Sequence, residues 1–173
     1  MRIRPATRSD LVAINAIYNP YVLTSPCTLQ LEPSTLPERE QWFLERSELY
    51  PATVAERDGQ IVGWGSLSPF HARSGYRGSV ENSVYVASAE HGKGIGSALL
   101  ADLIERAQRV GHHCIIARIT ATAGASLALH HRHGFVAAGT LREVGFKLGA
   151  YVDVAFLQKL LAGDPFSGDA PSR

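Results

Sequence analysis

A glycine-punctuated segment in the middle of the chain constrains the fold more than any other feature. An alternating apolar run over 81–86 is followed by polar residues 87–90 and then by His91-Gly92-Lys93-Gly94-Ile95-Gly96-Ser97. Apolar residues then recur at helical spacing over 97–110, and Gly111 stands where a helix stop is expected. The segment therefore predicts a strand, a glycine-rich turn and a helix, in that order.

Such a turn has the chemistry of an anion site. Glycines let the backbone approach a ligand closely, and the first N–H groups of a helix are unpaired donors. Lys93 adds a positive charge, so phosphate or pyrophosphate is the expected ligand. The spacing of Gly92, Gly94 and Gly96 matches neither the dinucleotide fingerprint G-x-G-x-x-G nor the phosphate loop G-x-x-x-x-G-K-[ST], which disfavours both of those sites.

The turn resembles the pyrophosphate loop of the GCN5-related N-acetyltransferases, approximately Arg/Gln-x-x-Gly-x-Gly/Ala. The preceding run Val80-Glu81-Asn82-Ser83-Val84-Tyr85-Val86 is similar to the phosphinothricin and methionine sulfone acetyltransferase branch, in which a glutamate stands just ahead of Ser/Thr-Val-Tyr-Val. The resemblance extends from Arg4 to about Lys159 and implies acetyl-CoA as cosubstrate, with no metal. The cofactor contacts that it implies come from the strand and the loop: Val84, Tyr85, Val86, His91, Gly92, Lys93, Gly94, Ile95, Gly96 and Ser97.

Glu81 is the catalytic base that the resemblance implies, because an amine must lose a proton before or as it attacks a thioester. The base would act directly or through a water. The alternative is a strand-end carboxylate that is solvated or pairs with Arg73, Arg77 or Arg118. The spacing alone does not separate the two interpretations.

A second motif lies in residues 125–135, which resemble Asn-x-x-Ser-x-x-Leu-His-x-x-x-Gly-Phe/Tyr. The resemblance implies that Ser126 and Arg132 contact the CoA arm and that His130 helps to move a proton. A hydrogen-bonding histidine on a helix packed against the sheet is the alternative for His130. Zinc binding by this histidine-rich run is disfavoured, because consecutive helical residues face different ways.

Ala123 departs from the family pattern, which has asparagine at that position. An alanine cannot make the amide hydrogen bond, so a cofactor contact of about 1 kcal/mol is lost unless Thr120 or Thr122 replaces it. We expect weaker CoA binding rather than loss of function.

The acceptor site is expected in two further segments that resemble those shaping the amino-acid pocket of this branch. The candidate residues are Arg73, Ser74, Gly75 and Tyr76, together with Glu81 and Tyr151, where the branch usually has tryptophan. Arginine suits a carboxylate or phosphinate group because its guanidinium can donate two parallel hydrogen bonds. The alternative is that the arginines in this loop are solvated surface charges. The resemblance implies acetylation of the α-amino group of an amino acid of the phosphinothricin, methionine sulfone or methionine sulfoximine type. Another amine, a protein N-terminus, and a non-catalytic CoA-binding module remain as alternatives.

The order of patterns predicts one α/β domain over 1–162, with a flexible tail over 163–173. Strands are predicted over 2–4, 52–56, 61–68, 80–86, 114–119, 135–138 and 152–158, and helices over 7–19, from 35, over 97–110 and over 125–132. We read residues 21–32 as a loop or short helix. These elements predict a mixed, mostly antiparallel twisted sheet of about six or seven strands flanked by helices. The resemblance adds that strands four and five splay apart around acetyl-CoA.

The overall charge and the hydropathy of the chain indicate which kinds of partner to expect. Seventeen basic residues balance sixteen acidic ones and no Lys/Arg run exists, which argues against a nucleic-acid partner. No apolar segment approaches the ~20 residues of a membrane span, and the N-terminus lacks a signal-peptide core, so we expect a cytoplasmic protein with no membrane partner. The expected partner is a small-molecule amine. A homodimer is expected from the resemblance alone.

Overall fold

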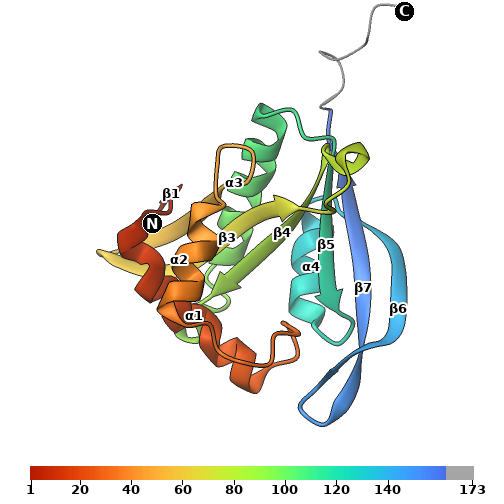
Figure 1. Cartoon of the computed structure of the whole chain (residues 1–173), viewed down its shortest axis with the longest axis horizontal. Helices are drawn as coiled ribbons and strands as arrows, with labels where there is room; N and C mark the ends of the chain where they lie inside the picture. Colours follow the sequence, from red (N-terminus) through yellow and green to blue (C-terminus); the bar gives the residue numbers. More distant parts are fainter. Residues whose placement is uncertain (163–173) are drawn as a thin grey trace, which may run out of the picture.

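A seven-stranded sheet in the order β1-β2-β3-β4-β5-β7-β6 forms the centre of the computed structural model, which describes residues 1–162 (Figure 1). All neighbouring strands are antiparallel except β4 and β5, which are parallel. The predicted mixed, mostly antiparallel sheet is confirmed, while the prediction of a flexible tail over 163–173 lies outside the described residues. The strands are β1 (Arg2–Pro5), β2 (Ala52–Arg57), β3 (Gln60–Pro69), β4 (Ser79–Val86), β5 (Cys114–Thr120), β6 (Val136–Lys147) and β7 (Ala150–Leu160).

Helices cover both faces of the sheet. One face carries α1 (Leu11–Thr24) and α2 (Leu36–Leu44), and the other carries α3 (Ile95–Arg109) and α4 (Gly124–Arg132) (Figure 1). Three short 3-10 turns, η1 (Arg8–Asp10), η2 (Ser74–Tyr76) and η3 (Ser88–Glu90), precede α1, β4 and the glycine-rich turn.

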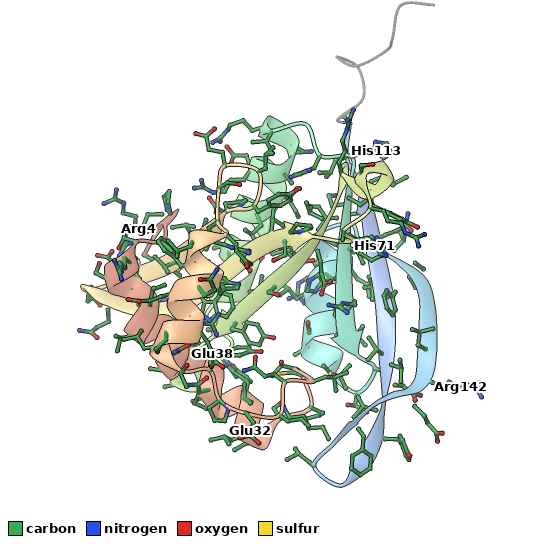
Figure 2. The ribbon with its side chains drawn as sticks, viewed as in Figure 1. Arg4, Glu32, Glu38, His71, His113 and Arg142 are labelled. Carbon is green, nitrogen blue, oxygen red and sulfur yellow. The ribbon has the colours of Figure 1, made fainter. Side chains whose placement is uncertain are left out.

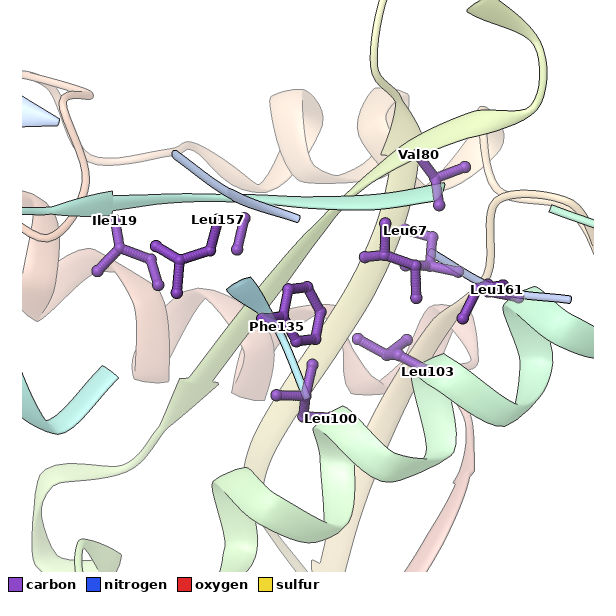
Figure 3. Close-up of a cluster of buried hydrophobic side chains, with 11 residues drawn as sticks. Leu67, Val80, Leu100, Leu103, Ile119, Phe135, Leu157 and Leu161 are labelled. Atoms are coloured by element: carbon purple, nitrogen blue, oxygen red, sulfur yellow. The ribbon is translucent and has the colours of Figure 1, made fainter. Parts of the chain in front are cut away.

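The main core lies between the sheet and α3. Leu100 and Leu103 of α3 pack with Leu67, Val80 and Phe135, and all five are buried (Figure 3). Because side chains alternate along a strand, the residues of β4 that follow Val80 in steps of two share its face, while the odd-numbered residues point toward α1 and α2. Each side of β4 therefore has a different set of neighbours.

Two local structures follow from the residue types that form them. Thr35 and Glu38 form a capping box at the start of α2 (Glu38 is labelled in Figure 2). The Glu38 carboxylate accepts from the Thr35 backbone N–H at 2.8 Å. Asp58 and Gly59, between β2 and β3, have φ values of 51° and 75°, as a two-residue hairpin turn with both residues left-handed requires.

Helix α1 is longer than the sequence predicts. We expect an end near Asn19-Pro20, because proline lacks the N–H that an internal helical position donates. The helix continues to Thr24, whose hydroxyl donates to the Pro20 carbonyl at 2.8 Å. Val22 is 1% exposed and the Tyr21 ring contacts the ring of Tyr85, so burial beyond the proline outweighs the lost hydrogen bond.

Strand β6 is also longer than predicted. It runs over Val136–Lys147, whereas the sequence predicts a strand only over 135–138. The register with β7 shifts between Ala137 and Gly139 and again between Leu141 and Gly145. These bulges break the alternation of side chains that identifies a strand, and β6 is an exposed edge strand without a regular apolar face.

Candidate functional site

The site lies where β4 and β5 separate. The two strands pair only from Ser79 with Cys114 to Glu81 with Ile116, and Figure 1 shows their ribbons diverging beyond that point. The β5-facing edge of β4 over 82–86 therefore has no strand partner, which confirms the predicted splay of the fourth and fifth strands. A cavity of about 1220 Å³ lies in this gap, and it is large enough for a cofactor-sized ligand.

Residues from both sequence motifs line this cavity, although they are far apart in the chain. Strand β4 supplies one wall, the turn and the start of α3 a second, and α4 a third. The predicted site residues that line it are Glu81, Val84, Tyr85, Val86, His91, Gly92, Gly94, Ile95, Gly96, Ser97, Ser126, His130 and Arg132.

The turn before α3 depends on its glycines. Gly92 and Gly94 have φ values of 75° and 80°, a conformation that L side chains rarely adopt. Helix α3 begins directly after Gly94, so its first N–H groups lie beside the cavity without partners inside the helix. Ile95 is 1% exposed and anchors that end of α3 in the core. The arrangement is that of an anion site at a helix start.

Lys93 is turned to a different partner. Its ammonium lies 3.1 Å from Glu90, whose other carboxylate oxygen accepts from Arg57 at 2.6 Å. Lys93 is not among the lining residues of the cavity. Its predicted contact with the cofactor stays a prediction.

His91 is tied to the end of β4. The Tyr21 hydroxyl donates to the Val86 carbonyl, and His91 Nε2 lies 2.6 Å from the same hydroxyl. The first residue of the glycine-rich turn is thereby held against the strand that precedes it. Tyr21, which makes this contact, belongs to the last turn of α1, beyond Pro20.

Glu81 stands at the closed end of the gap. Its carboxylate accepts a hydrogen bond from Nε of Arg118 on β5 at 2.7 Å, and the two side chains are 19% and 55% exposed. Pairing with Arg118 was one of the alternatives that the sequence left open, and the structure contains that pair. Glu81 also lines the cavity, and its role as the base stays a prediction.

His130 is buried and both of its ring nitrogens are engaged. Nδ1 donates to the Ser126 carbonyl at 2.8 Å, so Nε2 accepts from Asn82 Nδ2 at 2.9 Å, and the ring is neutral. Burial lowers the pKa of His130, which favours this neutral form. This geometry matches the alternative interpretation, a hydrogen-bonding histidine on a helix that packs against the sheet. A role of His130 in proton movement stays a prediction.

The region of Ala123 offers one replacement for the missing asparagine. The Thr120 hydroxyl donates to the Pro26 carbonyl at 2.6 Å and is thereby occupied. Thr122 and Ala123 both line the cavity. Thr122 is therefore the threonine placed to supply the contact that alanine cannot make.

Apart from Glu81, the predicted acceptor residues do not line this cavity. Arg73, Ser74, Gly75 and Tyr76 are exposed around η2, in the loop that carries His71 (labelled in Figure 2), and none of them lines the cavity. Tyr151 is 67% exposed on β7, with its ring 5.1 Å from that of Phe146. Their roles stay predictions.

Sequence reasoning missed a buried arginine on α2. Arg39 is 5% exposed and lines a second cavity of about 370 Å³ that shares Tyr18, Ser83 and Tyr85 with the first. The available signal was its spacing, because Arg39 stands three residues before Trp42 and so shares the inner face of α2.

Across residues 1–162, no three His, Cys, Asp or Glu side chains are grouped as a metal site requires. None of the helices in the described part of the chain is long and apolar enough to cross a bilayer.

Known proteins resemble the chain over most of its length. Residues 14–135 match the model of the family described as Acetyltransferase (GNAT) family. The L-methionine sulfoximine/L-methionine sulfone acetyltransferase of Salmonella typhimurium is 38% identical over 159 residues, which cover 91% of this chain and 93% of that protein. A crystal structure of ribosomal-protein-alanine N-acetyltransferase from Brucella melitensis is 46% identical, with a TM-score of 0.91 and coverage of 93% and 100%. A phosphinothricin acetyltransferase of the same superfamily from Sinorhizobium meliloti, in complex with acetyl-CoA, is 34% identical, with a TM-score of 0.90 and coverage of 99% and 93%.

Proposed function

Because the chain belongs to the acetyltransferase (GNAT) family, we propose that it transfers the acetyl group of acetyl-CoA to the α-amino group of a small amino-acid-like substrate. The match confirms the family predicted from residues 80–97. The proposed acceptors are of the phosphinothricin, methionine sulfone or methionine sulfoximine type, which the similarity to the Salmonella and Sinorhizobium proteins supports. The observation that carries the proposal is the unpartnered edge of β4, with Glu81 at one end and the glycine-rich turn at the other.

The residues around the gap fit acetyl-CoA. Along the edge of β4 over 82–86, the backbone groups that face the gap can pair with amides of the pantetheine arm, and a donor near Val84 can polarise the thioester carbonyl. The start of α3 suits the pyrophosphate, and Ser126 and Arg132 line the α4 side. Bound there, acetyl-CoA supplies the activated acetyl group.

Glu81 is the proposed base. It takes the proton of the acceptor ammonium directly or through a water, and the hydrogen bond from Arg118 orients the carboxylate. Burial raises the pKa of the Tyr85 phenol, so Tyr85 stays protonated at neutral pH and does not compete for that proton. His130, which lines the same cavity, remains the second candidate for proton movement.

A protein N-terminus is the second candidate acceptor. The 46% identity with the Brucella structure, whose name specifies a ribosomal-protein alanine, favours it. A peptide that begins with alanine therefore belongs in any acceptor panel, beside the free amino acids.

We also propose that the protein is a cytoplasmic homodimer. The β6–β7 hairpin exposes Leu141, Val144, Phe146, Leu148 and Tyr151, each at least half exposed. Phe146 and Tyr151 contact each other through their rings, and exposed large apolar side chains gathered on one hairpin are typical of an interaction site. Light scattering after gel filtration is expected to give twice the monomer mass, and Phe146→Glu is expected to shift the mass toward the monomer. A monomeric wild-type protein would refute the proposal.

The acetyl-transfer proposal is tested by thiol release from acetyl-CoA across the acceptor panel, for wild type, Glu81→Gln and the control Glu105→Gln. Glu105 is an exposed residue on the outer side of α3. We expect turnover with phosphinothricin or methionine sulfone, with Glu81→Gln about 100-fold slower at neutral pH and partly recovered at high pH, where free amine is abundant. Unchanged rates in Glu81→Gln would reject it as the base. Tight CoA binding without turnover on any amine would favour the non-catalytic module.

A further inference from the structure

A hydrogen bond joins the start of α3 to the end of α4. The Ser97 hydroxyl lies 2.7 Å from Nε2 of His133, although 36 positions separate the two residues in the sequence. Ser97 belongs to the first turn of α3 and lines the cofactor cavity, whereas His133 stands directly after α4 and does not line it. His133 can therefore act on a ligand in the cavity through the Ser97 hydroxyl.

Basic side chains gather around His133 at the end of α4. Arg132, the preceding residue, lines the cofactor cavity. Lys159 reaches the same turn from β7, because a Cβ at Gly134 would lie 2.9 Å from the Lys159 ammonium. Among residues 1–162, no carboxylate forms an ion pair with His133, Arg132 or Lys159. This side of the cavity is therefore electropositive and suits an anionic ligand.

The protonation of His133 decides where the Ser97 hydroxyl can donate. When Nε2 carries no proton, it accepts the Ser97 O–H, and the hydroxyl donates toward the end of α4. When Nε2 carries a proton, as it always does in the imidazolium form, it donates to Ser97 Oγ instead. The Ser97 O–H is then free to donate into the cavity, beside the unpaired N–H groups at the start of α3.

Without a bound anion, the surroundings of His133 favour its neutral form. Burial lowers the pKa of His133, and the charges of Arg132 and Lys159 lower this pKa further. No described residue forms a hydrogen bond with Nδ1, so this nitrogen is free to take up a proton. An anionic group bound beside Ser97 reverses the balance, because it attracts the imidazolium charge that Arg132 and Lys159 repel.

We propose that His133 is a positioning residue for the phosphate groups of coenzyme A, which directs the Ser97 hydroxyl toward them and takes up a proton as they bind. The inference rests on the proposed function, in which acetyl-CoA is the cosubstrate, but it does not depend on the acceptor. The imidazolium adds a positive charge near the start of α3, and the Ser97 O–H adds a donor to its N–H groups. Binding and protonation each favour the other, because the coupling between two binding events is reciprocal.

Calorimetric titration with coenzyme A, in the absence of any acceptor, tests the coupling. The affinity of the wild type relative to that of His133→Gln is expected to rise about three- to tenfold between about pH 8 and about pH 5.5. Glutamine can keep a hydrogen bond to Ser97 but does not titrate, and ionisation of the ligand itself cancels in this ratio. His131→Gln is the matched control, because His131 is an exposed histidine of α4 that does not line the cavity. Its affinity relative to the wild type should not change with pH.

Two further readouts identify the proton. Binding heats at about pH 6.5, the ordinary pKa of histidine, are measured in buffers of different ionisation enthalpy. We expect them to show more proton uptake by the wild type than by His133→Gln. NMR titration of the histidine Cε1–H signals is expected to give His133 a higher pKa with bound coenzyme A than without it. The signal that is missing from His133→Gln assigns the residue.

Ser97→Ala separates the hydroxyl from the charge. The imidazolium remains in this variant, so a smaller rise in affinity at low pH is expected. His133→Leu, which also removes the titrating group, replaces His133→Gln if glutamine is not tolerated at this half-buried position.

Parallel pH profiles of the wild type and the His133 variant, or an unchanged pKa of His133 on binding, would overturn the inference and leave acetyl transfer intact. Coupled binding without turnover on the acceptor panel would support the inference and count against the proposed reaction. Failure of the wild type to bind coenzyme A at any pH would overturn both.

Discussion

At the residue scale, Asp10 shows how one carboxylate joins a strand to a helix. Arg4 on β1 donates to both of its oxygens, at 2.7 and 2.9 Å, and the Thr7 backbone N–H donates at 2.7 Å. Asp10 is only 6% exposed. The Arg4 hydrogen bonds, together with those from Thr7, hold the pKa of Asp10 at about 2 although burial alone would raise it.

The Asp10 network is expected to make folding stability depend on pH. The folded pKa of about 2 lies below the reference value of 3.8, so the stabilisation is full above pH 3.8 and is lost as the pH falls through 2. We expect Asp10→Asn to lower the free energy of unfolding by about 2 kcal/mol at pH 7, and the difference to shrink as the pH falls toward 2. Urea denaturation at several pH values measures this.

The matched control for Asp10 is a carboxylate in an exposed ion pair. Glu40 pairs with Arg8 at 3.0 Å, and the Arg8 side chain is 77% exposed. Glu40→Gln is expected to change stability by less than about 1 kcal/mol. A pH-independent effect of Asp10→Asn would show that the carboxylate charge is not the source of the stabilisation.

At the element scale, β3 and α3 approach closely because β3 carries glycine where the helix crosses it. A Cβ at Gly63 would lie 3.1 Å from Ile95, Leu99 and the Tyr85 carbonyl. A Cβ at Gly65 would lie 3.0 Å from Leu103 and 3.2 Å from the Ser83 carbonyl. The close approach positions the start of α3, and with it the glycine-rich turn, against β4.

Gly65→Ala is expected to destabilise the protein by about 1–3 kcal/mol, because the backbone of β4 cannot move aside without disturbing its pairing with β3. Gly139→Ala on β6 is the control, since an added Cβ there meets nothing within 4 Å. The urea midpoint measures both variants. A similar shift for the two would mean that loss of backbone flexibility, rather than crowding, governs the effect.

At the scale of the whole molecule, the segment after α1 connects the two halves of the splayed sheet. Lys147 on β6 donates to the Thr28 carbonyl at 2.6 Å, and Thr120 on β5 donates to the Pro26 carbonyl. A Cβ at Gly145 would lie 2.6 Å from Leu29. The same segment therefore borders the cofactor cavity and contacts the strands beyond the gap.

Coenzyme A is expected to stabilise the folded state and to do so locally. At a concentration of 100 times its Kd, the free energy of unfolding should rise by about 2.7 kcal/mol. Amide hydrogen exchange should slow most in β4 over 82–86 and around residues 92–97, because these backbone groups border the gap. Exchange in β1 should change little. Protection spread evenly over the sheet would instead indicate that the ligand acts only through global stability.

Patterns confined to a few neighbouring residues were determined by the sequence itself. The capping box of Thr35 and Glu38, the Asp58-Gly59 turn and the glycines at 92 and 94 each act through local backbone geometry, so their structures follow from residue type and spacing. The position of Glu81, in the strand that leads into the turn and just ahead of Ser83-Val84-Tyr85-Val86, likewise indicated the family and the cofactor side of the sheet.

Contacts between distant segments were decided only by the tertiary structure. Helix α1 continues past Pro20 because Val22 and Tyr21 find buried neighbours, and β6 extends because β7 pairs with it across two bulges. Arg39 faces a cavity only because α2 lies over Trp64, and no spacing in the sequence records that crossing. The free energy of such contacts comes from packing of groups far apart in the chain, whereas a local pattern reports only the conformation of its own few residues.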